Sequence, residues 1–204
     1  MTLYIVIITS IISIFAFQSR ELMDKLIFNP FKVHKYNQWY RLVCSGFIHA
    51  DWMHLIFNMY VMYNFGRIVE DSYNVLFDDK GWYYFLLLYF GGLVFSILPT
   101  YNKHKDNYGY NALGASGAVS AIVFVFIIFQ PLTKLTLMFF PIPFPAWIFG
   151  IVYLGLEFYM DKRGGSNVNH NAHIWGALYG IIFTIALKPT IAMNFIDQLK
   201  SVFA

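Results

Sequence analysis

Ser116 stands at the start of a strongly apolar run, which reads GASGAVSAIVFVFIIF from position 114. A serine hydroxyl attacks a carbonyl carbon only when a base takes its proton, and histidine is the side chain best suited to do so near neutral pH. Gly114 and Gly117 flank the serine, and the first backbone N–H groups of a helix beginning here would favour a developing oxyanion. The alternative is that these small residues form a packing face between helices.

Donors for an oxyanion could come from another apolar segment, HADWMHLIFN. His54 and Asn58 are four residues apart and therefore share a face of a helix predicted over 50–69. His49 lies near the mouth of that helix. Each of these residues could instead bond to a neighbouring helix, but together they form a polar stripe on an apolar helix, which favours a functional role.

A base could come from the segment NHNAHIWGALYG. His173 lies just inside a helix predicted over 171–188, and Gly176 and Gly180 follow it at a spacing that permits close contact with another helix. We expect His170, one turn earlier, to be exposed.

The candidate residues on these three segments together supply the parts of a hydrolytic site. Ser116, His173 and the His54/Asn58 stripe supply a nucleophile, a base and oxyanion donors from three different helices. The set is that of a serine hydrolase built inside a membrane. Glu157, near the end of another apolar segment, is interpreted as interfacial.

The elements that must position this set are membrane helices. The 204 residues are 58% hydrophobic and 12% charged, which is about half the charge of a soluble domain. Charge-free runs near the ~20 residues needed to span a bilayer recur along the chain. The prediction is an all-α, polytopic membrane protein with one domain over 1–204, an interfacial insert over 19–49 and six transmembrane helices: 3–18, 50–69, 82–100, 115–130, 145–160 and 171–188.

Composition excludes several other classes. A net charge of +3 is too small to indicate nucleic-acid binding, and the lone Cys44 allows no disulfide framework or cysteine-rich metal site. The first apolar run lacks the basic start and cleavage site of a signal peptide, so we interpret it as a retained helix. The distribution of lysine and arginine leaves the membrane orientation undecided.

The sequence resembles the rhomboid family of intramembrane serine proteases in its bacterial, six-helix form. The matching motifs are HADWMHLIFNMY, GASGA and AHIWGALYG, in this order along the chain. FGRIVE at 65–70 and YR at 40–41 also resemble family features. The resemblance implies Ser116 as nucleophile, His173 as general base and later general acid, and oxyanion stabilisation by His54, Asn58 and the backbone N–H of Gly117.

The resemblance also implies an environment and a substrate. It implies transmembrane protein substrates, a site opening outward, an internal amino terminus, and no metal or cofactor. The expected location is the bacterial inner membrane.

Two positions depart from the family pattern. Tyr40 stands where a tryptophan is frequent, and Ser120 stands where a bulky aromatic normally stacks on the histidine. The Ser120 hydroxyl, or an aromatic from another helix, would then have to orient His173.

Other functions stay open. An inactive rhomboid relative would serve as a membrane chaperone or binding protein, although such relatives typically lack the serine or the histidine. A histidine-lined transporter would need intramembrane carboxylates, and Glu157 is the only candidate. The His-Glu-x-x-His motif of metalloproteases and the Gly-x-Ser-x-Gly elbow of soluble hydrolases are absent from the sequence.

Overall fold

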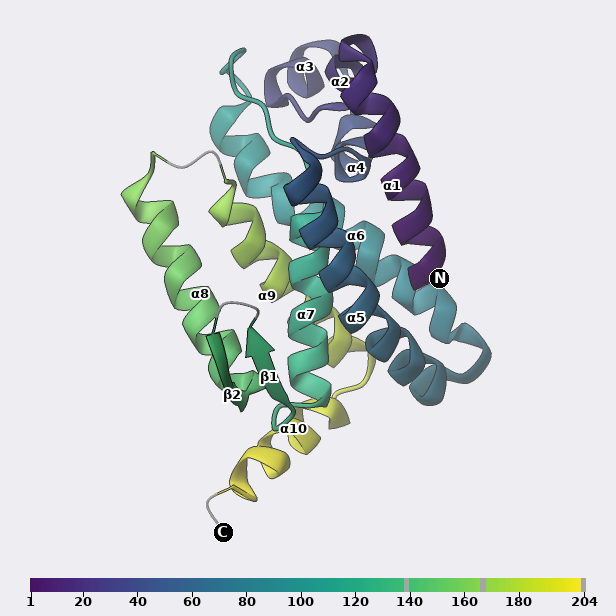
Figure 1. Ribbon diagram of the computed structural model, residues 1–204, viewed down its shortest axis with the longest axis vertical. Helices are drawn as coiled ribbons and strands as arrows, with labels where there is room; N and C mark the ends of the chain where they lie inside the picture. The colour runs from purple at the N-terminus through teal and green to yellow at the C-terminus, as the bar shows by residue number, and fades with distance from the viewer. Residues whose placement is uncertain (138–139, 166–167, 203–204) are drawn as a thin grey trace.

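A computed structural model describes residues 1–137, 140–165 and 168–202 of the chain. It is mostly helical, as predicted (Figure 1). Its elements are α1 (Thr2–Gln18), α2 (Arg20–Leu26), α3 (Pro30–Tyr36), α4 (Arg41–Cys44), the 3-10 turn η1 (Ser45–Phe47), α5 (Trp52–Phe77), the 3-10 turn η2 (Asp78–Lys80), α6 (Gly81–His104), α7 (Ser116–Phe129), β1 (Lys134–Leu137), β2 (Phe140–Pro145), α8 (Ala146–Arg163), α9 (His170–Leu187) and α10 (Thr190–Lys200).

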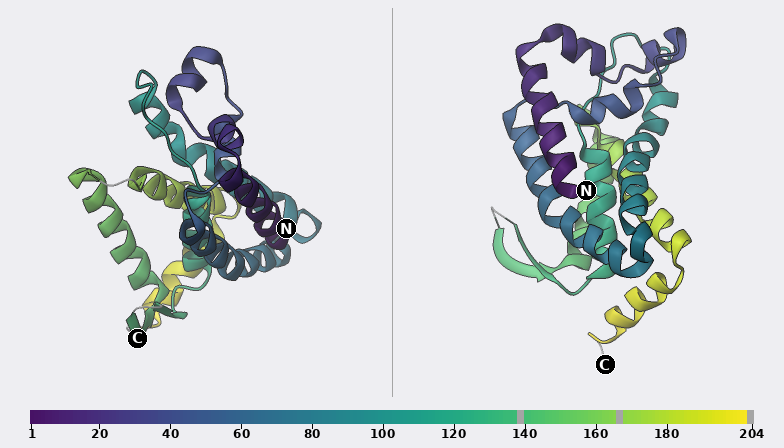
Figure 2. Two further views of the ribbon diagram at one scale, coloured as in Figure 1. Left: turned by 45° about the horizontal axis from the view of Figure 1, so that its top comes forward. Right: turned by 90° about the vertical axis from the view of Figure 1, so that its right-hand side faces the viewer.

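Helix α7 forms the centre of the bundle. Twelve of its fourteen residues are buried, as expected of a helix that is apolar on every side. Helices α5, α6 and α9 pack around it, and α1 packs on α5 (Figures 1 and 2). Ser116 is the first residue of this central helix, so the candidate nucleophile is held by the best-packed element of the fold.

Helix α8 stands apart from the other long helices (Figure 2). An apolar cavity of about 490 Å³ lies between α8 and helices α7, α9 and α10. Its lining includes Phe124, Ile127, Leu154 and Ile181. Helix α8 is therefore less tightly attached to the bundle than α9.

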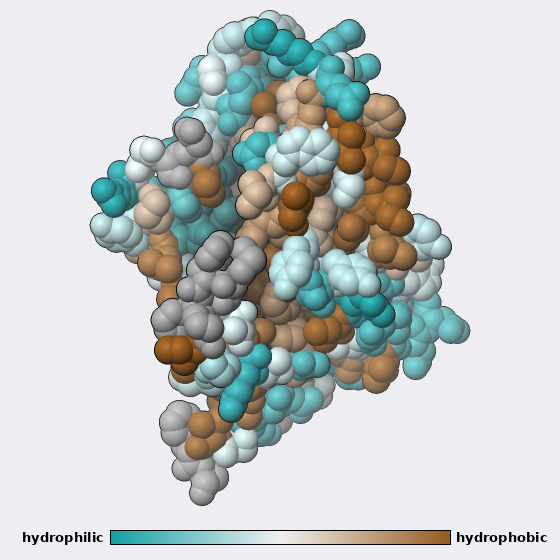
Figure 3. Space-filling model, in the orientation of Figure 1, coloured by the Kyte–Doolittle hydropathy of each residue, from teal (hydrophilic) through white to brown (hydrophobic). Residues whose placement is uncertain are grey.

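The insert over 19–49 forms short helices joined to the segment that leads into Ser116. The Asn29 side chain caps α3 by accepting a bond from Lys32 N at 2.8 Å, and Phe28 pairs with Ala112 through two backbone bonds of 3.0 Å. Arg41 is buried, and its Nη1 donates to two backbone carbonyls of the insert at 2.7 and 2.9 Å. Hydrophilic side chains gather over this end of the molecule, above a mainly hydrophobic middle (Figure 3).

Two elements after α7 were not predicted from the sequence. The all-α prediction omits a two-stranded antiparallel hairpin, β1–β2, between α7 and α8, with Lys134 opposite Pro145 and Leu135 opposite Phe144. The prolines of β2 alternate, so every second residue keeps the N–H that pairing requires. Beyond α9, the chain bends by 111° into α10, an amphipathic helix that was not predicted.

The six expected membrane spans are only partly supported. Within the described ranges, length and composition mark one helical stretch, Trp52–His104, as able to cross a membrane. It comprises α5, η2 and α6 and reverses direction at Asp78, whose φ is 48°. A second stretch qualifies if α9 and α10 are taken together, while α1 and α7 are shorter apolar helices. Six spans therefore remain a prediction.

Candidate active site

Ser116 and His173 meet where α7 and α9 begin. The Ser116 Oγ lies 2.8 Å from His173 Nε2, within hydrogen-bonding distance. The two helices approach closely because a glycine of α9 faces the backbone of α7 at each of the next two turns. A Cβ placed on Gly176 would lie 2.1 Å from the Gly117 carbonyl oxygen, and one on Gly180 would lie 2.4 Å from that of Ala121.

A side-chain cap fixes the start of α9. Asn169 Oδ1 accepts a hydrogen bond from Ala172 N at 3.1 Å, as N-cap residues do. The same side chain bonds to Thr100 of α6, with Nδ2 lying 3.1 Å from Oγ1. His173 therefore lies on a helical turn that is tied both to its own cap and to a neighbouring helix.

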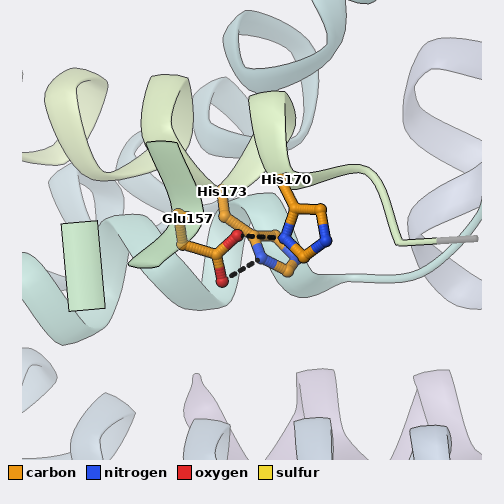
Figure 4. A group of neighbouring side chains, drawn as sticks. All are labelled: Glu157, His170 and His173. Carbon is orange, nitrogen blue, oxygen red and sulfur yellow. Dashed lines mark hydrogen bonds and ion pairs between the residues drawn. The ribbon is translucent and has the colours of Figure 1, made fainter. Parts of the chain in front are cut away.

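The carboxylate of Glu157 joins two histidines (Figure 4). Its Oε1 lies 3.0 Å from His173 Nδ1 and its Oε2 lies 2.6 Å from His170 Nδ1. The three side chains are only 12–13% exposed. The expectation that His170 is exposed was wrong, and Glu157 is a partner of the histidines rather than an isolated interfacial residue. Carboxylate and imidazole are also the groups that could hold a metal ion.

This arrangement decides which nitrogen of His173 carries a proton. An ionised carboxylate can only accept hydrogen bonds, so the Nδ1 facing Glu157 must be an N–H. In a neutral imidazole the other nitrogen, Nε2, then has a free lone pair. That lone pair faces the Ser116 hydroxyl, which is the tautomer that a base for Ser116 requires.

An aromatic ring from α8 replaces the one missing at position 120. Tyr153 lies nearly parallel to the His173 ring, at 23° and with 6.4 Å between the ring centroids. The Tyr153 hydroxyl lies 3.0 Å from Ser120 Oγ. Ser120 therefore contacts the tyrosine instead of bonding to the histidine directly. The structure thus places the ring of another helix beside His173 and Ser120 against the hydroxyl of that ring, while the group that orients His173 stays a prediction.

His54 lies beside Gly114, two residues before the serine, and Asn58 faces back along its own helix. A Cβ on Gly114 would lie 3.0 Å from His54 Nε2, and the φ of Gly114 is +111°, which favours glycine. Asn58 is buried, and its Nδ2 donates to the His54 carbonyl at 2.9 Å. One of its two amide protons is thus used inside α5. His49 is buried edge-on to the His54 ring, and its Nδ1 lies 3.0 Å from Ser13 Oγ.

Sequence reasoning missed the contribution of α8. Tyr153 and Glu157 are four residues apart, so they share a face of that helix. The same spacing singled out His54 and Asn58. The sequence therefore indicates a polar stripe on α8, but it does not indicate that this stripe faces α9.

Comparison with known proteins gives consistent results. Residues 36–190 match the family model described as the Rhomboid domain. The chain is 33% identical to RHOMBOID-like protein 12, mitochondrial, of Arabidopsis thaliana over 159 residues, which are 72% of this chain and 46% of that protein. It is 27% identical to Rhomboid-like protein 11, chloroplastic, of the same plant over 177 residues, which are 79% of this chain and 58% of that protein.

A third relative comes from an animal. Presenilin-associated rhomboid-like protein A, mitochondrial, of Danio rerio is 29% identical over 142 residues, which are 69% of this chain and 35% of that protein. The chain thus spans about half the length of the curated relatives it matches.

Proposed function

This chain belongs to the rhomboid family, and we propose that it is an intramembrane serine endopeptidase with Ser116 as nucleophile and His173 as base. The observation that carries the proposal is the 2.8 Å contact between Ser116 Oγ and His173 Nε2. It joins two residues that are 57 positions apart in the sequence. The unprotonated Nε2 inferred above gives this contact the direction that proton transfer needs.

The proposed reaction has two halves. Ser116 Oγ attacks the carbonyl carbon of a peptide bond while its proton passes to His173 Nε2. The C–N bond then breaks, and the leaving amine takes that proton from His173. Water hydrolyses the resulting ester at Ser116, giving one proton to His173, which returns it to the serine oxygen as the acyl group leaves.

The negative oxygen formed in each half needs donors. The backbone N–H of Gly117 lies in the first turn of α7, where helix N–H groups lack partners within the helix. The His54 ring abuts Gly114, two residues before Ser116. The second amide proton of Asn58 is the third candidate. We propose that these groups stabilise the oxyanion, and that Glu157 and Tyr153 are positioning residues that act through His173.

The proposed substrates are transmembrane segments of other proteins. At 1.5 Å per residue, the fourteen residues of α7 extend about 21 Å, less than the ~30 Å of a bilayer core. If α7 reaches one membrane surface with its C-terminal end, Ser116 lies several ångströms below the other. A peptide bond near the end of a membrane helix would lie at that depth.

The family consists of membrane proteins, but the type of membrane is a separate question. The three relatives carry mitochondrial or chloroplast names, so they give no support to the expected bacterial inner membrane. That location stays a prediction. Fractionation of the source cells would test it directly.

The proposal is tested with purified protein and a model transmembrane substrate. We expect cleavage by the wild type and none by Ser116→Ala or His173→Ala, with all three proteins folded by circular dichroism. The two losses should not add in the double variant, because the residues act as one unit. A folded wild type that binds the substrate without cutting it would favour the inactive, substrate-binding alternative.

A further inference from the structure

His170 has no part in the proposed cleavage, yet it bonds to the carboxylate that faces His173. A base for Ser116 requires one imidazole and one acceptor at Nδ1, and Glu157 meets that need with Oε1 alone. The second oxygen of Glu157 is directed at His170 (Figure 4). One atom from each of the three residues lies within 4.8 Å of the other two. The proposed cleavage therefore leaves the contact between Glu157 and His170 without a role.

We propose that Glu157, His170 and His173 form a binding site for a divalent transition-metal ion, zinc above all, and that its occupation stops cleavage. Two imidazoles and one carboxylate are ligands that zinc prefers, with the fourth position left to water. The binding half of the proposal stands on the three side chains alone. The inhibitory half rests on the proposed function.

The distances require little adjustment for a metal. Bonds of about 2.0–2.1 Å in a tetrahedron place ligand atoms roughly 3.3 Å apart. The two observed nitrogen–oxygen separations, 2.6 and 3.0 Å, involve different oxygens of Glu157. With one ligand atom taken from each residue, the three atoms lie within 4.8 Å of one another, so each pair has to move by no more than about 1.5 Å to reach the tetrahedral spacing. His170 is the first residue of α9 and Glu157 lies on α8, the helix set apart from the bundle. Small shifts of this size are therefore possible without moving α7.

The partners of His170 also leave room for a metal. Its Nε2 is buried, and no hydrogen-bond partner for it lies among the described residues. Among the described residues, the hydrogen bond of this ring is therefore the one at Nδ1, the atom that would bind the ion, and the ring also lies edge-on to that of His173. The three side chains are 12–13% exposed, which keeps the site partly shielded while leaving an approach from solvent.

Metal binding would reverse the direction of the Ser116 contact. A metal at His173 Nδ1 needs the lone pair of that nitrogen, so the neutral ring must carry its single proton on Nε2 instead. Nε2 then donates to Ser116 Oγ and can no longer accept the serine proton. The number of protons on the ring is unchanged, but the serine has lost its base.

Zinc binding is measured first, in variants that cannot cleave. Isothermal titration of zinc chloride into Ser116→Ala and into Ser116→Ala/His170→Ala should give a Kd at least tenfold weaker in the second, because one of three ligands is gone. Zinc should also raise the thermal midpoint of the first variant and not that of the second. Equal zinc affinity and equal midpoint shifts in the two variants would overturn the site.

Inhibition is measured second, with each protein compared with its own zinc-free rate. Zinc should inhibit the wild type, EDTA should reverse the effect, and His170→Ala should need at least tenfold more zinc. His34→Ala removes an exposed histidine of α3 and serves as the control, with wild-type sensitivity expected. Equal inhibition of His170→Ala and the wild type would overturn the regulatory role. His170-dependent zinc binding by a wild type that cleaves nothing would instead overturn the proposed function and leave the site standing.

Discussion

Replacing Gly176 by alanine adds one carbon where α7 and α9 meet backbone to backbone. The new Cβ would lie 2.1 Å from the Gly117 carbonyl oxygen and 2.8 Å from its carbon. Ordinary contacts are near 3.5 Å, so α9 must move away from α7 by more than about 1 Å at this level. His173 is one turn earlier on α9, and Ser116 adjoins Gly117. The Ser116–His173 contact would therefore lengthen from 2.8 Å to beyond hydrogen-bonding range.

The expected result is a loss of activity accompanied by a moderate loss of stability. A displacement of about 1 Å at reacting groups can cost on the order of 10²-fold in rate, and overpacking typically costs about 1–3 kcal/mol of unfolding free energy. The assay combines initial cleavage rates on a transmembrane substrate with thermal unfolding in the same detergent. We expect Gly176→Ala to be folded, about 10²-fold slower and less stable than the wild type.

A second glycine provides the matched control. Gly155 lies within α8, and a Cβ there would meet no heavy atom within 4 Å. Alanine is preferred to glycine inside a helix by roughly 0.5–1 kcal/mol, so Gly155→Ala should keep the wild-type rate and be slightly more stable. A Gly176→Ala protein with wild-type rate and thermal midpoint would refute the close-packing argument. Equal damage from both substitutions would show that the effect does not arise at the α7–α9 contact.

Three other sets of substitutions test the groups around Ser116 and His173. Glu157→Gln removes the negative charge facing His173 and should lower kcat at least about tenfold with little change in KM; an altered KM alone would argue against positioning. Ser120→Ala and Tyr153→Phe each break the same hydroxyl contact, so their effects on rate across pH 6–8 should be similar and should not add in the double variant. Full additivity would show that the two hydroxyls act separately. Asn58→Ala and His54→Ala should lower kcat more than they weaken substrate binding, since oxyanion donors act in the transition state; a pure binding defect in both would make the stripe structural.

The sequence carried enough information to place Ser116 and His173 on facing helices. The signal was local in each case: a serine between small residues at a helix start, and a histidine followed by glycines at a four-residue spacing. Such glycines predict that a helix lies close by without identifying it. The motif resemblance identified the partner, and the structure then brought the two side chains together.

The partners of His173 were beyond this kind of reasoning. The roles proposed for Glu157 and Tyr153 depend on the direction in which α8 faces α9, and that direction depends on how the two helices pack against each other rather than on local pattern. The hairpin was missed because the prolines at 141, 143 and 145 argue against a strand unless they fall at positions that need no N–H. Helix α10 was missed because its apolar residues are too few to form a span: Ile191, Ala192, Met193, Phe195, Ile196 and Leu199.

Covalent labelling measures whether His173 activates Ser116 as a nucleophile. A fluorophosphonate reports an activated serine by forming a stable bond to its oxygen, and mass spectrometry of peptides then locates the modified residue. We expect the folded protein to be labelled at Ser116 and at no other serine, and we expect His173→Ala to abolish the labelling while the protein stays folded. Labelling of Ser116 that persists at the wild-type rate in His173→Ala, or a folded wild type that takes up no reagent at Ser116, would contradict that activation of Ser116.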